Sequence, residues 1–114
     1  MSEAKKSEVN WSAVLMEALA SANAATQELI DANPGVWYPC GFAWVNIKPA
    51  RGKLVEMLKA KCIGYTDSYY GGYSISNPSH NATQWMDAKI AGAYAFAAVL
   101  KKHGINCSVN QRID

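Results

Sequence analysis

The chain has 114 residues, of which 50% are hydrophobic and 18% charged, and its net charge is +2. A chain of this size and composition can bury one core of ordinary size. This excludes an intrinsically disordered chain and a protein of several large domains. The charge is far below that of dedicated nucleic-acid-binding domains, and no apolar run approaches the roughly 20 residues that a membrane span requires.

Charge is divided unequally along the chain. Residues 1–35 contain two lysines and five acidic residues, whereas residues 36–114 contain nine basic and four acidic residues. We therefore expect two parts, a polar tail with an amphipathic helix over residues 1–35 and an α+β domain over residues 36–114. The basic balance of the second part is compatible with an anionic partner.

An N-terminal amphipathic helix is expected from about Ser7 to Ala32. Asn33-Pro34-Gly35 ends it, because proline disfavours helical geometry in the residue before it and glycine permits a reversal. The apolar residues of the helix fall on one stripe at helical spacing: Trp11, Leu15, Ala18, Ala22, Ala25 and Leu29. This alanine-rich stripe leaves three arrangements open, in which the helix docks on the body, pairs with a second copy or stands partly free.

The first strand is expected over Gly41–Ile47. Alternation places Ala43, Val45 and Ile47 on one face and three further side chains on the other, namely Phe42, Trp44 and Asn46. Since both faces are largely apolar, this strand belongs at the centre of a sheet.

A helix is expected next, over Ala50–Lys61, with Pro49 suited to its first turn because a missing N–H costs nothing there. Two short strands follow, Ile63–Tyr70 and Tyr73–Asn77. The Gly71-Gly72 dipeptide between them readily adopts the positive φ angles of a tight hairpin turn.

The loop Asn77–Asn81 breaks the third strand. Asn81, followed three residues later by Gln84, resembles a capping box that opens a long helix, and Gly104 stops that helix. A last strand begins at Ile105, with Ile105, Cys107 and Val109 facing inward and the alternate residues facing outward: Asn106, Ser108, Asn110 and Arg112.

This order of elements, βαββαβ, predicts a ferredoxin-like (split βαβ) α+β sandwich with an extra N-terminal helix. The handedness of the crossovers places the first and third strands at the centre and the second and fourth at the edges. Two helices would cover one face of the sheet and leave the other face free.

The free face is the first candidate binding surface. RNA-recognition modules share this architecture and stack unpaired bases on aromatic residues of the two central strands. The alternative is that Phe42 and Trp44 are covered by the N-terminal helix or by a second copy. The tyrosine-rich hairpin and the loop before the last helix, where free backbone N–H groups could hold an anion, are two further candidates. Together they predict ligand- or partner-binding residues at Phe42, Trp44, Asn46, Tyr69, Tyr70, Tyr73, Ser79, His80, Asn81 and Arg112.

The three cysteines, Cys40, Cys62 and Cys107, have no metal-site spacing, and each is expected to be a reduced, buried thiol beside a strand. Without a signal-peptide pattern in the first residues, we expect a cytoplasmic protein. We also expect no cofactor and no metal, because the two histidines lie far apart and no acidic cluster accompanies them.

Several segments resemble small uncharacterised proteins of tailed bacteriophages: Tyr38–Val45, Asn77-Pro78-Ser79, the Gln84–Lys89 pattern and the closing Arg112-Ile113-Asp114. The resemblance covers about residues 36–114. It implies an accessory protein that acts in the cytoplasm of an infected host, and it carries over no catalytic residue.

The sequence therefore favours a non-enzymatic binding module that engages a host protein or a nucleic acid through the free sheet face. One alternative is a homo-oligomeric structural or scaffold protein, with a homodimer as the simplest form. Another is a small hydrolase or transferase that uses His80 with Asp67 or Ser79.

Overall fold

The computed structural model describes residues 9–35, 39–81 and 83–113, which form three helices and one four-stranded antiparallel sheet. The α+β class expected from the sequence is confirmed. In chain order the elements are α2 (Trp11–Asp31), β1 (Gly41–Ile47), α3 (Lys53–Ala60), β2 (Tyr65–Thr66), β3 (Tyr73–Ser76), α4 (Met86–Lys102) and β4 (Cys107–Ile113).

The strands lie in the order β2-β3-β1-β4, and each neighbouring pair is antiparallel. The prediction that the first and third strands are central is confirmed. The two edges differ in length, because β2 has two residues whereas β4 pairs with β1 over seven consecutive positions, from Gly41 opposite Ile113 to Ile47 opposite Cys107.

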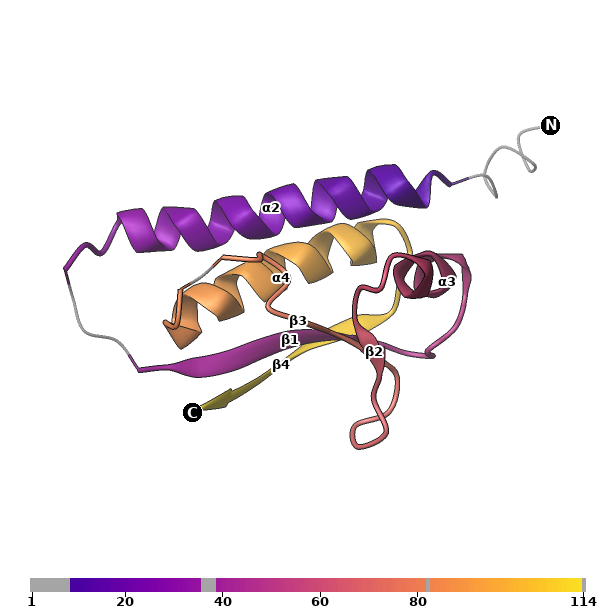
Figure 1. Cartoon of the computed structure of the whole chain (residues 1–114). Coiled ribbons are helices and arrows are strands. Elements are labelled where there is room, and N and C mark those ends of the chain that lie inside the picture. The colour runs from indigo at the N-terminus through magenta and orange to yellow at the C-terminus, as the bar shows by residue number, and fades with distance from the viewer. Residues whose placement is uncertain (1–8, 36–38, 82, 114) are drawn as a thin grey trace.

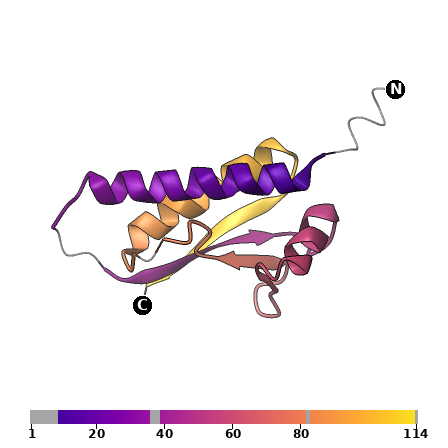
Figure 2. The same cartoon turned by 45° about the horizontal axis from the view of Figure 1, so that its top comes forward.

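The molecule has three layers. The sheet forms the first, α4 lies against it over β1 and β4, and α2 lies on the far side of α4 (Figure 1; Figure 2). The short helix α3 lies near one end of the sheet and adds Leu54, Val55 and Leu58 to the core. One continuous core therefore joins α2, α4 and the covered face of the sheet.

The position of α2 selects one of the three arrangements left open by the sequence, since the helix docks on the body. Its buried residues are Val14, Leu15, Ala18, Ala22 and Thr26. The Thr26 hydroxyl donates a 2.7 Å hydrogen bond to the carbonyl oxygen of Ala88 on α4. Because α2 shares the core with α4, it contributes to the same folded unit. The expected boundary between residues 1–35 and residues 36–114 stays a prediction.

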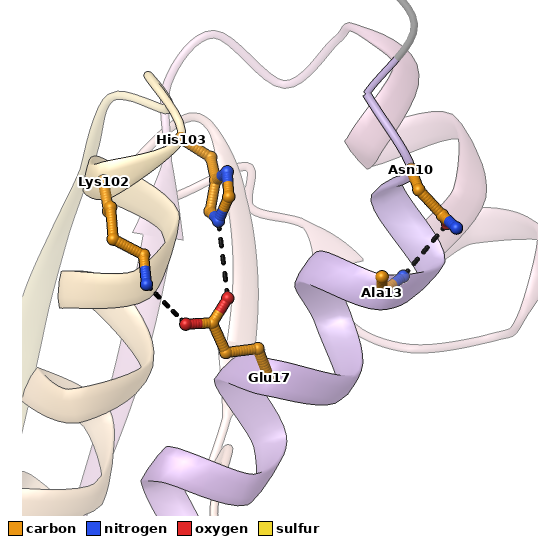
Figure 3. A network of polar contacts seen from close by, with 5 residues as sticks. All are labelled: Asn10, Ala13, Glu17, Lys102 and His103. Atoms are coloured by element: carbon orange, nitrogen blue, oxygen red, sulfur yellow. Dashed lines mark hydrogen bonds and ion pairs between the residues drawn. The ribbon is translucent and has the colours of Figure 1, made fainter.

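An exposed polar cluster joins one end of this helix pair (Figure 3). Lys102 donates to the Glu17 carboxylate, and Nε2 of His103 lies 3.4 Å from the other carboxylate oxygen. The Lys102 ammonium, followed by the His103 ring, holds the pKa of Glu17 below its ordinary value. Asn10 caps the same helix by accepting from the N–H of Ala13 (Figure 3).

Two predicted helix starts are wrong. The last helix begins at Met86 rather than after a capping box at Asn81, because the Asn81 side chain accepts from the N–H of Thr83 within an irregular turn. Helix α3 begins at Lys53, so Pro49 lies in the loop before it and not in its first turn.

The cysteine prediction holds for one thiol of three. Cys107 is buried, and this burial raises the pKa of its thiol. Cys40 and Cys62 are exposed, so the expectation of burial is wrong for both. Cys62 follows the end of α3 with φ of 59°, in a reversal of the chain.

Candidate functional site

The face of the sheet away from α4 carries the aromatic side chains that the sequence singled out. Ala43, Val45 and Ile47 of β1 are buried in the core, so the alternate residues of the same strand point to the opposite face. Phe42 is 41% exposed there, and Trp44 is partly buried. Neither ring lies between the helices, and we call this surface the aromatic face.

Phe42 lies between two cations. The ammonium of Lys89 is 5.4 Å from the centre of its ring, and the guanidinium carbon of Arg112 is 5.2 Å from it. Arg112 is the direct neighbour of Phe42 across β1 and β4, whereas Lys89 reaches the ring from α4. Cations are attracted to the negative face of an aromatic ring, so this arrangement places positive charge beside an exposed aromatic surface.

Lys89 is a buried lysine that forms no ion pair with any carboxylate among the described residues. It is 7% exposed, and its ammonium donates a 2.9 Å hydrogen bond to the carbonyl oxygen of Gly41. The ion pairs found among the described residues involve Lys102 and His103 and not Lys89. Among the described residues, the groups that face this ammonium are therefore the Gly41 carbonyl oxygen and the Phe42 ring.

Three rings form a continuous row on this face. The ring centres of Trp44 and Tyr70 are 5.6 Å apart, and those of Tyr70 and Tyr69 are 4.6 Å apart with their planes nearly perpendicular. The loop that carries the two tyrosines projects from the sheet on the side away from the helices (Figure 1). Tyr69 is 85% exposed and Tyr70 is 47% exposed, so the row extends the accessible surface beyond β1.

Asp67 organises the start of this loop. One oxygen of its carboxylate accepts from the backbone N–H groups of Tyr69 and Tyr70, each at 2.9 Å, and the other accepts from the Ser74 hydroxyl. These hydrogen bonds, with that from Tyr70 the strongest, lower the pKa of Asp67. Asp67 is 8% exposed, so its carboxylate serves the loop itself and is largely removed from water.

Acid should loosen the tyrosine loop. The folded-state pKa of Asp67 lies below its unfolded value of about 3.9, so the stabilisation is complete above that value and is lost as pH falls through the folded pKa. We expect tryptophan fluorescence to change below about pH 4, as Tyr70 leaves Trp44. Asp67→Asn keeps the shape of the side chain but removes its titrating carboxyl group, so it should abolish this change in fluorescence. Exposed Glu28→Gln should keep it, and a step unchanged in Asp67→Asn would contradict the assignment.

Two predicted binding residues are structural instead. Asn46 is 1% exposed and donates hydrogen bonds to the Gly71 carbonyl oxygen and the Ser74 hydroxyl, so it holds the far end of the tyrosine loop. Tyr73 is also 1% exposed and lies in the core, where its hydroxyl donates to the Ile63 carbonyl oxygen and burial raises its pKa. Both side chains are buried, so neither adds to the exposed surface of the aromatic face.

The loop with Ser79, His80 and Asn81 lies elsewhere, beside α2. The Asn81 amide donates to Gln27 of α2, and the Ser79 hydroxyl donates to Asn77 and accepts from the Asn81 N–H. Exposed His80 borders a shallow surface groove of about 390 Å³, lined by Met16, Leu19, Ala20, Asn23, Ser79 and His80. These three residues therefore do not join Phe42, Trp44 and Arg112 in one site.

Two backbone N–H groups at the start of α4 already have acceptors. The N–H of Met86, where α4 begins, donates to the Pro39 carbonyl oxygen, and the N–H of Trp85 donates to the Thr83 hydroxyl. Asp67 and Ser79, the partners considered for His80 in a hydrolase, are hydrogen-bonded elsewhere. Ser79 lines the same groove as His80, but its hydroxyl donates to Asn77.

Lys89 is the functional candidate that sequence reasoning did not select. It lies near the start of α4, and a lysine on a helix usually keeps its ammonium in water. The sequence offered one signal. Lys89 lies one helical turn after Trp85, the aromatic residue that precedes α4 and pairs with Cys40 just before β1. Only the pairing of Gly41 with the segment before α4 brings its ammonium to Phe42.

Across residues 9–35, 39–81 and 83–113, no group of three or more His, Cys, Asp or Glu side chains could hold a metal ion. None of the helices described is long and apolar enough to cross a membrane. Comparison with known proteins adds no further assignment, since no family model, no curated protein and no solved structure matches this chain.

Proposed function

We propose that the chain is a non-enzymatic binding module whose aromatic face engages single-stranded nucleic acid. The observation that carries this proposal is the exposed Phe42 ring flanked by Lys89 and Arg112. Proteins that bind single strands combine aromatic rings, on which bases stack, with cations that follow the phosphates. Both elements meet here, since the two cations lie 5.4 and 5.2 Å from the centre of the Phe42 ring.

The charge around the site supports an anionic partner. Lys48 also lies beside the tyrosine loop, where its charge acts on Asp67. Asp67 is the one carboxylate among the described residues of the aromatic face, and its oxygens are occupied by internal hydrogen bonds. A phosphate backbone would therefore meet cations, aromatic rings and neutral polar side chains on this face.

The fold and the sequence motifs add independent support. The strand order and the antiparallel pairing agree with a ferredoxin-like arrangement, in which an uncovered sheet face is a common binding surface. The resemblance of residues 36–114 to small phage proteins supports a role as an accessory protein in the cytoplasm of an infected host. The alternative proposal is that a host protein binds the same aromatic face.

Phe42→Ala should weaken binding of a labelled oligothymidylate of about ten nucleotides roughly tenfold at low salt, because base stacking contributes about 1–3 kcal/mol. Arg112→Ala should also reduce the dependence of binding on salt by about one phosphate contact. Fluorescence anisotropy titrations at several salt concentrations measure both effects.

Two surface variants serve as controls. Tyr94→Ala removes an exposed aromatic ring from α4, and Arg51→Ala removes an exposed cation beside α3, each away from the aromatic face. Both should bind as the unchanged protein does. If the oligonucleotide gives no signal at low salt, or if the control variants lose as much affinity as Phe42→Ala, the nucleic-acid proposal is rejected and a protein partner takes its place.

A further inference from the structure

The outer edge of β4 is a long strand edge with no neighbour. β4 stands last in the strand order, and no other strand of the described residues pairs with its second side. Proteins usually protect such edges with proline, a bulge, an inward-pointing charge or a short strand. β4 has seven residues, contains no proline and pairs with β1 in unbroken register, and Arg112 is its single charged residue.

The pairing shows which backbone groups point outward. Lys48 N–H donates to the Asn106 carbonyl oxygen, so Asn106 bonds toward β1. Because these bonds alternate along an antiparallel strand, Ser108, Asn110 and Arg112 also bond toward β1. The N–H and C=O groups of the intervening residues point to the open edge: Cys107, Val109, Gln111 and Ile113.

We propose that this edge pairs with the β4 strand of a second copy, antiparallel, about a two-fold axis at Asn110. This register overlaps the whole strand and places outward-pointing residues opposite one another, with Val109 facing the partner's Gln111 and Cys107 facing the partner's Ile113. The two sheets then form one eight-stranded sheet. The inference does not depend on the proposed nucleic-acid function.

The side chains of β4 are self-complementary in this register. Arg112, the single charged residue of the strand, lies opposite the partner's Ser108, so no like charges meet. Ile113, an apolar side chain that is 70% exposed in the isolated chain, moves beside the partner's Cys107, whose side chain faces α4. A second copy therefore supplies both the backbone partners and the apolar contact that this edge lacks.

Disulfide trapping tests the two-fold axis directly. In a background with the exposed thiols replaced by Cys40→Ser and Cys62→Ser, Asn110→Cys should form a covalent dimer on mild oxidation. Residue 110 faces itself as a non-hydrogen-bonded pair, with Cα atoms about 4.5 Å apart, which is within disulfide range. In the matched control Ser108→Cys, the two thiols are separated by about 14 Å along the strands and should not cross-link.

Light scattering tests the interface without cross-linking. The unchanged chain should have twice the 12.4 kDa mass of one copy. Gln111→Pro removes an outward N–H and no bond to β1, so it should give a folded monomer by circular dichroism, whereas Gln111→Ala should stay dimeric. A 12.4 kDa species at the highest attainable concentration, or equal cross-linking of Asn110→Cys and Ser108→Cys, would overturn the proposal.

Discussion

Gly92→Val should lower the free energy of unfolding by about 3 kcal/mol, the upper end of the cost of overpacking a close-packed core. A side chain at this position of α4 points at α2. An added Cβ would lie 2.4 Å from the Thr26 hydroxyl oxygen and 3.2 Å from the Ala22 carbonyl oxygen. The second atom belongs to the backbone and cannot rotate away, so α2 must shift and the hydrogen bond from Thr26 to Ala88 must break.

Urea unfolding measures this effect, with Ala98→Val as its control. Ala98 lies on the exposed side of α4 and receives the same β-branched side chain, so its cost should stay near 0.5 kcal/mol, as is usual for surface positions (about ±0.5 kcal/mol). Because valine has a higher helix propensity than glycine, propensity cannot explain a loss of stability in Gly92→Val. Ala98→Val shows what the same β-branched side chain costs at an exposed position of α4. Equal midpoints for both would show that α2 does not pack closely on α4.

Asn46→Ala should destabilise the protein by about 2 kcal/mol and release the tyrosine loop, because it leaves the Gly71 carbonyl oxygen without its donor. The same change removes the bond to Ser74, which itself holds Asp67. Loss of the Tyr70 contact should alter the fluorescence of Trp44, and urea unfolding gives the change in stability.

Asn106→Ala is the matched control for this loss. Asn106 also donates a side-chain hydrogen bond to a backbone carbonyl, that of Lys48, but it is exposed, so water can replace the bond. Its cost should fall within about 0.5 kcal/mol. If Asn46→Ala costs no more than Asn106→Ala, the buried amide does not anchor the loop.

The sequence predicts the α+β class, the central strands and the faces of β1, because these follow from element order and from strict alternation. It fails at the hairpin for a specific reason. A two-residue Gly71-Gly72 turn would place Tyr70 and Tyr73 opposite each other on one face, but the strands close earlier, at Thr66 opposite Tyr73. Asp67 caps the backbone N–H groups of a longer loop. Tyr73 faces the core because it lies opposite the buried Ile47 of β1.

The candidate site is only partly predictable for a related reason. Phe42, Trp44 and Arg112 follow from alternation on two neighbouring strands, whereas Lys89 reaches the site only through the packing of α4. That helix is buried on two sides, against the sheet and against α2, so a single apolar stripe is a poor guide to its contacts. Small residues such as Ala88 and Gly92 carry the second contact without a periodic signal of their own.

The contact between α2 and α4 depends on residues with very small side chains or none. Ala18, Ala22 and Gly92 let the two backbones approach, and any larger residue at these points must intrude on the opposite helix. Natural variants of this chain would then be free to drift at Met16 and Tyr94, which face water, while the touching positions are confined to the smallest amino acids. Selection at the positions where α2 touches α4 would then act on side-chain volume more than on side-chain polarity.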